Sequence, residues 1–400
     1  MLNKIFIILI NKNFIYSINI KLLKLMSIGI DFVGTDLSSG TKTYIINFCN
    51  ELNSLKFSSN ITIFICKSYL IHFKKVKNKK IKYVIKSNFL SITPLRFLWM
   101  QLIFPFELKL LGIKKLFSPM NFSPILSKLF HIKTILCLHS NLPWIYFNLM
   151  PGNLLRNFIT KKLMELSIYT CDILIVNSSF AKNEIIQLLR LNKKNIKVIY
   201  LGINKVFILK KYEKELIKNF NYNQKYILSV ISCVKYHNII NLLMAFKLLI
   251  KNFEIKFVLV LQILDKEYFL DIKKFISENL LKEKIIIFSN LDINKLPRLY
   301  RNAELYVFSS YCEVFGYTSL EAMSKQVPVL ISNKSSLPEI NDNAAIYFDP
   351  DNINEIENLF KKIIFSKKLK KKLTKLGNIQ YKKYNSKENI QKTINVIESL

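Results

Sequence analysis

Residues 304–324 read ELYVFSSYCEVFGYTSLEAMS. The apolar run at 304–308 is typical of a buried strand, and a helical pattern begins near Thr318 after a loop with one glycine, Gly316. A strand, a loop and a helix in this order form the repeating unit of an open parallel sheet, which binds ligands beyond the carboxyl ends of its strands. Backbone N–H groups at the start of such a helix attract anions. The stretch therefore predicts an α/β fold with a site suited to a diphosphate.

The same alternation continues on both sides of this unit. Strands are expected at 27–33, 61–66, 81–85, 132–138, 172–176, 196–199, 226–231, 256–262, 284–288, 304–308 and 328–331. Helices are expected at 41–54, 94–111, 153–170, 179–191, 239–251, 266–281, 293–302, 318–325 and 353–364. The polar stretch 204–225 interrupts the pattern once. We therefore predict an α/β chain of two Rossmann-like domains, whose parallel sheets face a central cleft.

The pattern also predicts the extent of each part. The N-terminal domain is expected over 26–203, the linker over 204–225 and the C-terminal domain over 226–365. Charged helices are expected over 366–400, either on the second domain or crossing back to the first. Residues 1–25 are apolar but interrupted by Lys and Asn, and they lack the small-residue cleavage site of a signal peptide. We interpret them as an extension that is either unstructured or on a membrane surface.

The composition limits the function classes. The 400 residues include 60 Lys and Arg against 27 Asp and Glu, a formal net charge of +33. Such a field attracts phosphates, nucleic acid or anionic lipid, unless the extra lysines only cover solvated faces. Aromatic residues do not alternate with the lysine runs as in a stacking platform, so we expect no nucleic-acid partner. The six Cys and four His have no metal-binding spacing, which favours a reducing cytoplasm and no metal site.

The opening stretch contains two carboxylates. Glu313 falls in the loop and Glu321 about one turn into the helix, so they reach different parts of one ligand. A carboxylate accepts hydrogen bonds from hydroxyl groups, whereas phosphates carry no donor for it. The pair therefore suits the hydroxyls of a sugar nucleotide whose diphosphate lies at the start of the helix. The alternative is a pair of solvated glutamates.

The region around these carboxylates, 291–340, resembles the C-terminal domain of the retaining, family 4 type glycosyltransferases, the group 1 family of the GT-B fold. That family has Glu-x7-Glu, with Phe-Gly after the first Glu and Glu-Ala-Met at the second. The chain has all of these residues: Glu313, Phe315, Gly316, Glu321, Ala322 and Met323. It also has the flanking residues of the family: Leu296, Pro297, Leu299, Tyr300, Ala303, Pro328, Val329, Ser335, Ser336, Leu337, Pro338 and Glu339. A weaker resemblance extends over 27–365.

The resemblance implies roles for residues of both domains. Glu313 would contact the donor sugar near the reacting centre, and Glu321 would hold the ribose hydroxyls. The loop residues that would approach the donor are Phe315, Gly316, Tyr317 and Thr318. His139, directly after a predicted strand, matches a histidine near the reacting sugar; the alternative is a structural loop histidine. Gly40 and Thr41 match the glycine loop on the acceptor side.

The chain departs from the family where an Arg and a Lys usually clamp the diphosphate. Ser232 stands at the Arg position and His237 at the Lys position, with Lys235 nearby. A protonated His237 or a reoriented Lys235 would replace that charge. Losing one preorganised donor of transition-state stabilisation lowers a rate by about 10²–10³-fold. The departure therefore leaves open a catalytically degenerate, donor-binding pseudoenzyme.

The resemblance implies a retaining transferase that moves a hexosyl group from a UDP-, GDP- or dTDP-sugar to a glycan or a lipid-linked acceptor. The expected process is cell-surface polysaccharide synthesis by a mannosyltransferase-like enzyme, without a cofactor or an essential metal, and the sequence does not identify the donor sugar. The lysine run 74–82 and the aromatic stretch 97–106 suit an anionic bilayer, which would place the protein at the cytoplasmic face of the inner membrane. The alternative is a solvated loop and an ordinary core helix around Trp99.

Overall fold

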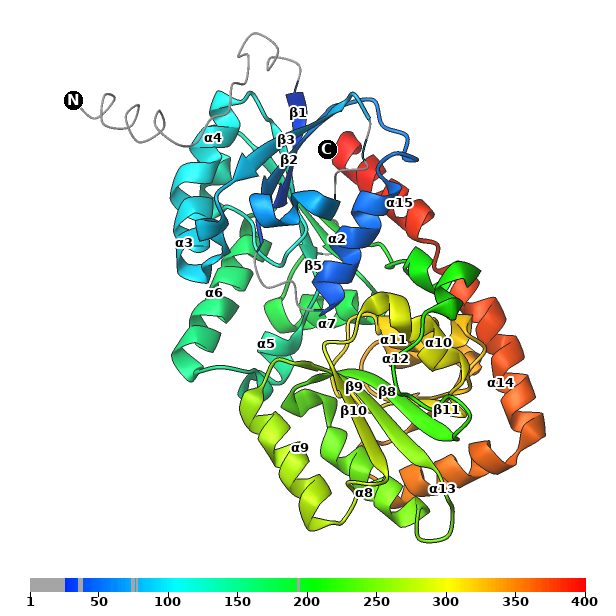
Figure 1. Ribbon diagram of the computed structural model, residues 1–400. Coiled ribbons are helices and arrows are strands. Elements are labelled where there is room, and N and C mark those ends of the chain that lie inside the picture. The colour runs from blue at the N-terminus through cyan, green and yellow to red at the C-terminus, as the bar shows by residue number, and fades with distance from the viewer. Residues whose placement is uncertain (1–25, 35–38, 73–75, 77, 193–194) are drawn as a thin grey trace.

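Two parallel sheets organise the chain (Figure 1). The structure is a computed structural model that describes residues 26–400, apart from 35–38, 73–75, 77 and 193–194. The strand orders are β3-β2-β1-β4-β5-β6-β7 and β10-β9-β8-β11-β12-β13. In both sheets the first strand lies in the interior and the chain builds outward from it in two directions, which is the doubly wound Rossmann arrangement. The predicted α/β class with two parallel sheets is therefore confirmed.

The first sheet and its covering helices occupy the N-terminal half of the chain. The strands are β1 (Met26–Phe32), β2 (Asn60–Cys66), β3 (Ile81–Lys86), β4 (Lys115–Ser118), β5 (Lys133–Leu138), β6 (Ile173–Val176) and β7 (Ile196–Val198). The α-helices are α2 (Ser39–Glu51), α3 (Thr93–Leu98), α4 (Phe104–Leu110), α5 (Leu142–Ile145), α6 (Leu154–Thr170) and α7 (Ser179–Leu189). The shorter turns are η2 (Lys67–His72), η3 (Asn88–Ser91), the π-helical η4 (Trp99–Ile103), η5 (Ile125–Phe130) and η6 (Phe147–Leu149).

The second sheet and the C-terminal helices follow. The strands are β8 (Tyr226–Cys233), β9 (Lys256–Ile263), β10 (Ile285–Ser289), β11 (Leu305–Phe308), β12 (Val329–Ser332) and β13 (Ala345–Phe348). The α-helices are α8 (Ile239–Leu249), α9 (Lys266–Glu278), α10 (Leu296–Arg301), α11 (Tyr317–Ser324), α12 (Leu337–Asn341), α13 (Ile353–Phe365), α14 (Lys367–Gln380) and α15 (Ser386–Ser399). In the sequence, the turns η8 (Lys205–Phe207) and η9 (Lys210–Lys214) come between β7 and β8. The turn η10 (Lys235–His237) follows β8.

The structure differs from the predicted elements in several places. The short helices α5 and α12 were not predicted. The helix expected over 94–111 is divided into α3, a π-helical turn and α4, because Pro105 near the start of α4 has no backbone N–H to continue the helix. The strands β4 and β13 were not predicted. Each has only four residues and is bordered by polar residues, so neither has a hydrophobic run long enough to be recognised.

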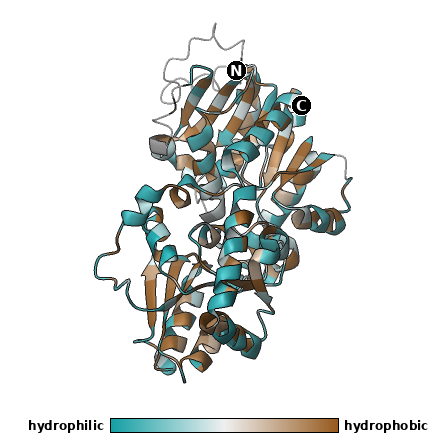
Figure 2. Ribbon diagram, turned by 90° about the vertical axis from the view of Figure 1, so that its right-hand side faces the viewer, coloured by the Kyte–Doolittle hydropathy of each residue, from teal (hydrophilic) through white to brown (hydrophobic). Residues whose placement is uncertain are grey.

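Apolar side chains cover both faces of the first sheet. On one face, α2 and α15 pack through Phe48 and Ile390 onto Ile28 and its neighbours. On the other face, Trp99 and the π-helical segment pack over β2, and α6 and α7 lie beside them. Figure 2 shows the strands of both sheets largely in the hydrophobic colour, with hydrophilic helix surfaces around them. The cores therefore lie between sheet and helices, which leaves the carboxyl ends of the strands free for a site.

The lysine run of the N-terminal half does not border the cleft. Lys79 and Lys80 directly precede β3 and are exposed, so they lie at the amino ends of the strands, opposite the cleft edge. Lys80 Nζ donates to the backbone carbonyls of Phe57 and Ser58, at 3.1 and 3.2 Å. Lys82 is an exposed residue of β3, and the lysines of this run at 74, 75 and 77 lie outside the described residues.

The last helix returns to the first domain. The chain runs along the second domain through α14, and α15 then packs against α2 (Figure 1). Lys115 Nζ donates to the Glu398 carbonyl at 2.7 Å, and Asn389 Nδ2 donates to the Leu201 carbonyl at 3.3 Å. Gly202 lies under the start of α15, where a Cβ would be 2.1 Å from the Cα of Ser386. Both chain crossings between the domains thus meet at Gly202.

We expect Gly202→Ala to destabilise the protein by more than the ~1–3 kcal/mol typical of overpacking, because the added methyl meets backbone atoms that cannot rotate away. The melting temperature measures the effect. Gly40→Ala is the matched control, since a Cβ at Gly40 meets nothing within 4 Å. Equal melting temperatures for the two variants would show that α15 does not dock as described.

Candidate active site

A cavity of about 750 Å³ lies between the two domains, at the carboxyl ends of the strands. The first domain contributes residues that follow β4 and β5, together with the start of α2. The second domain contributes the ends of β8, β9 and β11 and the loop before α11. Of the predicted site residues, the cavity is lined by Gly40, Thr41, His139, Ser232, His237, Glu313, Phe315, Gly316, Tyr317, Thr318 and Glu321. Lys235 is exposed and is not part of this lining.

The loop before α11 opens a helix start toward the cavity. Gly316 has φ +85°, and a Cβ there would lie 2.6 Å from Leu337 Cδ2, so only glycine fits without strain. No side chain caps α11, which leaves backbone N–H groups at Tyr317 and Thr318 available to a ligand. Thr318 Oγ1 accepts a hydrogen bond from the buried Tyr306 hydroxyl at 2.6 Å. The helix start is thus held in place and suits an anion.

Glu321 is buried in the cavity wall, with 6% of its surface exposed. One carboxylate oxygen accepts a hydrogen bond from the Tyr300 hydroxyl at 3.0 Å. Burial raises the pKa of Glu321 to about 7, and the bond from Tyr300 opposes the shift. The second oxygen has no such partner among the described residues. The carboxylate is therefore oriented by the protein and can accept hydrogen bonds from ligand hydroxyls.

Glu313 forms an ion pair with His237. His237 Nε2 lies 3.1 Å from Glu313 Oε1, and His237 Nδ1 lies 2.7 Å from the Ser232 carbonyl oxygen. A carbonyl can only accept, so Nδ1 carries a hydrogen. The opposite nitrogen, Nε2, faces the Glu313 carboxylate, and a proton between them would complete this contact as a hydrogen bond. Such a proton would be placed to offset negative charge on a ligand.

Two serines that follow β12 hold the Glu313 backbone. The Glu313 N–H donates to Ser335 Oγ at 2.8 Å, and the Ser336 hydroxyl donates to the Glu313 carbonyl, also at 2.8 Å. The loop is thereby fixed at both its N–H and its C=O. Both serines are among the flanking residues that the chain shares with the family, and no role was predicted for them.

His139 follows β5 on the opposite side of the cavity. Its ring nitrogen Nδ1 lies 2.9 Å from Asn177 Nδ2, and its backbone N–H donates to Asn121 Oδ1 at 2.6 Å. The centres of the His139 and Tyr44 rings are 5.0 Å apart. Burial lowers the pKa of His139 to about 4, and a hydrogen bond with the Pro119 backbone opposes the shift. His139 is therefore a neutral imidazole near pH 7. It can exchange hydrogen bonds with a sugar but cannot neutralise a phosphate.

Few positive charges face this cavity despite the basic chain. No Lys or Arg is among the described residues that line it, whereas Glu313, Glu321 and Asp292 are. Within the described ranges, no cluster of three or more His, Cys, Asp and Glu could hold a metal ion. Among the described lining residues, only the two histidines have a side chain that can carry a positive charge, and burial keeps His139 neutral near pH 7. The other histidine is His237, next to Glu313.

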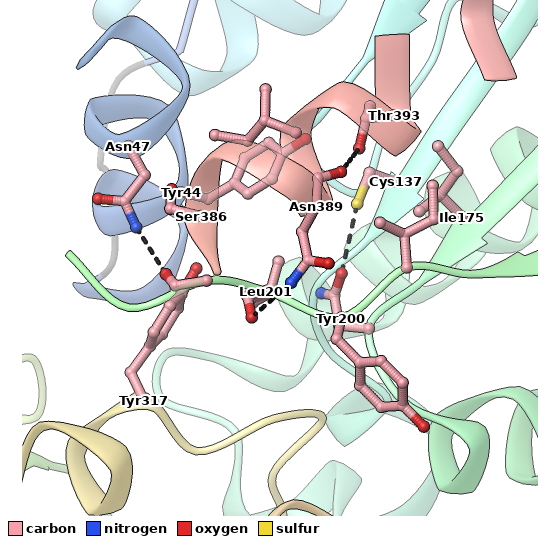
Figure 3. Close-up of a pocket in the computed structure, with 14 residues that line it drawn as sticks. Tyr44, Asn47, Cys137, Ile175, Tyr200, Leu201, Tyr317, Ser386, Asn389 and Thr393 are labelled. Atoms are coloured by element: carbon pink, nitrogen blue, oxygen red, sulfur yellow. Dashed lines mark hydrogen bonds between the residues drawn. The ribbon is translucent and has the colours of Figure 1, made fainter. Parts of the chain in front are cut away.

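The loop before α11 also brings Tyr317 into contact with the first domain. Tyr317 extends from the start of α11 into a small cavity of about 10 Å³ that Tyr44, Asn47 and Ser386 also line (Figure 3). The Tyr317 and Ser386 hydroxyls are buried without a hydrogen-bond partner in the described structure. The space is the size of one water molecule, which would satisfy both groups.

Glu339 makes a second contact between the domains. Its carboxylate accepts hydrogen bonds from the backbone N–H groups of Ser179 and Phe180, at 2.8 and 2.7 Å, and from the Tyr200 hydroxyl at 2.8 Å. Ser179 and Phe180 begin α7, so a carboxylate of the second domain caps a helix of the first. Together with the contact of Tyr317, this carboxylate connects the two domains.

Comparisons with known proteins agree with this geometry. The model of "Glycosyltransferase Family 4" matches residues 38–206, and the model of "Glycosyl transferases group 1" matches residues 210–380. The O-antigen chain mannosyltransferase RfbU of Salmonella typhimurium is 24% identical over 225 residues, 56% of this chain and 59% of that protein. O-antigen chain mannosyltransferase B of Escherichia coli is 46% identical over 61 residues, 15% of this chain and 16% of that protein. The matches thus span less than two thirds of either relative.

Solved structures share the architecture over almost the whole chain. Anabaena HepE, solved with UDP, has a TM-score of 0.71 at 14% identity and covers 94% of this chain and 100% of its own. Sucrose-phosphate synthase of Thermosynechococcus elongatus has a TM-score of 0.73 at 16% identity, with 94% and 98% covered. At these identities the likeness establishes the fold, which is GT-B. With one family model on each domain and the Glu pair in a cleft between two Rossmann-like sheets, the chain belongs to the group 1 glycosyltransferases.

Proposed function

We propose that this protein transfers a hexosyl group, with mannose as the first candidate, from a nucleotide-diphosphate sugar to a growing glycan or a lipid-linked acceptor, with retention of configuration. The observation that supports the proposal is one cavity that contains the start of α11, Glu321 and the Glu313–His237 pair, which would face the diphosphate, the ribose and the sugar. The names of RfbU and mannosyltransferase B support mannose and O-antigen synthesis. HepE, solved with UDP-glucose, supports a nucleotide-sugar donor.

The chemistry follows from the placement of charge. Departure of the nucleoside diphosphate would be aided by the N–H groups at the start of α11 and by a proton held between His237 and Glu313. The acceptor hydroxyl would enter from the side of Gly40 and Thr41 and attack the face that the leaving group vacates. The diphosphate would take the hydroxyl proton. Positioning and electrostatics would carry the rate, and no metal or cofactor is required in this scheme.

The surroundings that we propose follow from the acceptor class. A lipid-linked acceptor is embedded in a bilayer, and nucleotide sugars are made in the cytoplasm, so the protein would act at the cytoplasmic face of a membrane. None of the helices in the described ranges combines the length and the apolar character needed to cross a bilayer. Association would then be peripheral.

The substitutions at Ser232 and His237 favour a second candidate. The cavity lining of the described part has no Lys or Arg, so the leaving group meets less positive charge than the family pattern supplies. A protein of this kind could bind a nucleotide sugar without transferring it. Binding without turnover would distinguish this pseudoenzyme from the transferase.

A thermal-shift panel of GDP-, UDP- and dTDP-sugars tests the donor site. We expect one nucleotide to raise the melting temperature of the wild type and to leave Glu321→Ala unchanged, because Glu321 presents the carboxylate for the ribose hydroxyls. That nucleotide would identify the base. No shift with any nucleotide at saturating concentrations would contradict both the transferase and the pseudoenzyme.

A further inference from the structure

The segment from η3 to α4 is apolar on its outer side as well as its inner side. Inward, Trp99, Met100 and Phe104 are buried, which confirms the core alternative for Trp99. Outward, large side chains follow one another at helical spacing, with their exposed fractions: Leu95 44%, Leu98 58%, Leu102 64%, Phe106 36% and Leu110 62%. A helix that is apolar all round is normally buried in a protein core or in a membrane.

The apolar surface continues onto neighbouring elements. The turn η5 contacts both α4 and α6, so the three lie side by side on one face of the first sheet. On η5, Leu129 is 72% exposed, and on the end of α6 that hydrogen-bonds to Ser123 beside η5, Leu166 is 47% exposed. Phe89 of η3 is 74% exposed. A folded monomeric protein rarely exposes this much apolar surface in one region, and such a surface marks an interaction site.

The charges around this surface are positive. Between residues 88 and 170 the sequence has nine Lys or Arg and two Glu. Both glutamates are paired with lysines, Glu107 with Lys86 and Glu165 with Lys162. The exposed Lys109, Lys114 and Lys128 on and beside α4 and η5 have no carboxylate partner among the described residues. A basic rim around an apolar face matches an anionic bilayer.

A second copy of the chain fits this face less well. Face-to-face pairing would bring two basic rims together on chains of formal charge +33 each. The position relative to the site also favours a bilayer. Gln101 in η4 donates to the Ser123 carbonyl at 3.2 Å and accepts from the Ile125 N–H at 2.7 Å. It thereby links the apolar segment to the chain that follows Asn121, which lines the first-domain side of the cavity.

We propose that the outer face of η3, α3, η4, α4 and η5 docks the protein on an anionic lipid bilayer by partial insertion of its leucine and phenylalanine side chains. This orientation places the acceptor side of the cavity next to the lipid headgroups. The inference deepens the proposed function, since it gives a lipid-linked acceptor a route to the site, but the docking itself does not depend on sugar transfer.

Co-sedimentation of the full chain with vesicles tests the docking face. Vesicles of phosphatidylcholine with roughly a third phosphatidylglycerol should bind the wild type, whereas pure phosphatidylcholine vesicles should bind it weakly. The triple variant Leu98→Gln, Leu102→Gln, Leu110→Gln should lower the partition coefficient on the order of 100-fold or more, because three apolar side chains no longer enter the bilayer. The matched control is Leu216→Gln, Leu270→Gln, Leu280→Gln, which changes leucines of the linker and second domain with 54%, 63% and 88% exposure.

The outcomes separate the alternatives. Unchanged binding of the first triple variant would overturn the proposal and move the lipid contact elsewhere, for example to residues 1–25. A wild-type dimer that the same variant converts to a monomer, without vesicle binding, would identify a second copy as the occupant. The donor-induced thermal shift is measured on the same samples. Its presence in the triple variant shows a folded chain, and its absence in the wild type would count against the proposed function while leaving the docking result valid.

Discussion

Glu321→Ala is expected to weaken binding of the nucleotide-sugar donor by about 10²–10⁴-fold, because two hydrogen bonds to a charged acceptor are lost at ~1.5–3 kcal/mol each. The carboxylate is buried and already oriented by Tyr300, so little ordering is needed when the ligand arrives. Calorimetric titration with the nucleotide identified in the panel measures the effect. Tyr300→Phe keeps the carboxylate but not its orientation, and we expect a loss of about tenfold.

The control for this series is Glu304→Ala. Glu304 lies just before β11 and pairs with Lys370 of α14 at 2.6 Å, away from the cavity lining. Donor affinity should stay at the wild-type value. An equal loss in Glu304→Ala and Glu321→Ala would mean that the second domain had been destabilised generally, and the assignment of Glu321 to the ribose would fail.

The same residue predicts a pH dependence of donor binding. Burial raises the pKa of Glu321 to about 7, so part of the free protein carries a protonated carboxyl at neutral pH. Hydroxyl donors favour the ionised form, so the dissociation constant should rise up to about tenfold for each pH unit below 7 and level off above it. Glu321→Gln should remove this slope. It should also raise the melting temperature of the free protein at pH 8, because ionising a carboxyl whose folded pKa is raised destabilises the fold.

His237→Asn is expected to lower the turnover number by about 10²–10³-fold while changing donor affinity much less. The reason is that a proton held between His237 and Glu313 would offset charge that develops only as the diphosphate leaves. Single-turnover release of nucleoside diphosphate separates the two effects. His237→Lys keeps a cation at the site and should retain most of the rate.

His131→Asn is the control for the histidine series. His131 is exposed at the end of η5 in a left-handed conformation that Asn tolerates, and it does not line the cavity. Its turnover should equal that of the wild type. If His237→Asn also turned over at the wild-type rate, the helix start at α11 would suffice and the shared proton would have no catalytic role.

Local patterns predicted the centre of the site well. The strand, the loop with Gly316 and the helix with Glu321 are adjacent in sequence, so their spacing alone fixes how they approach a ligand. Their placement in β11, the loop and α11 agrees with the prediction. The hydrogen-bond partner of Glu321 could not be predicted in this way. Tyr300 lies 21 residues away on α10, and only the fold brings its hydroxyl to the carboxylate. Resemblance flagged Tyr300 as a flanking residue but gave it no role.

The contacts that the sequence did not predict are made either by backbone groups or by residues far apart in the chain. Ser232 was placed where the family has an Arg, yet it is the backbone carbonyl of this residue that orients His237. Any residue has that carbonyl, so the side-chain type carried no signal. Glu339 likewise caps α7 from the other domain, 160 residues from Ser179, and this contact depends on how the two sheets pack. Lys235 was predicted from charge alone, but the turn after β8 exposes it.

We propose that this cleft transfers sugar although its lining, in the described part of the chain, has no Arg or Lys. The most direct measurement is the release of nucleoside diphosphate from the donor that binds, with and without lipid extract as the source of acceptor, for the wild type and Glu313→Gln. We expect the wild type to release nucleoside diphosphate only when the extract is present. The rate of this release should fall by about 10²–10³-fold in the variant. Donor binding without release by the wild type, at any pH and with any extract, would contradict the proposal and identify a pseudoenzyme.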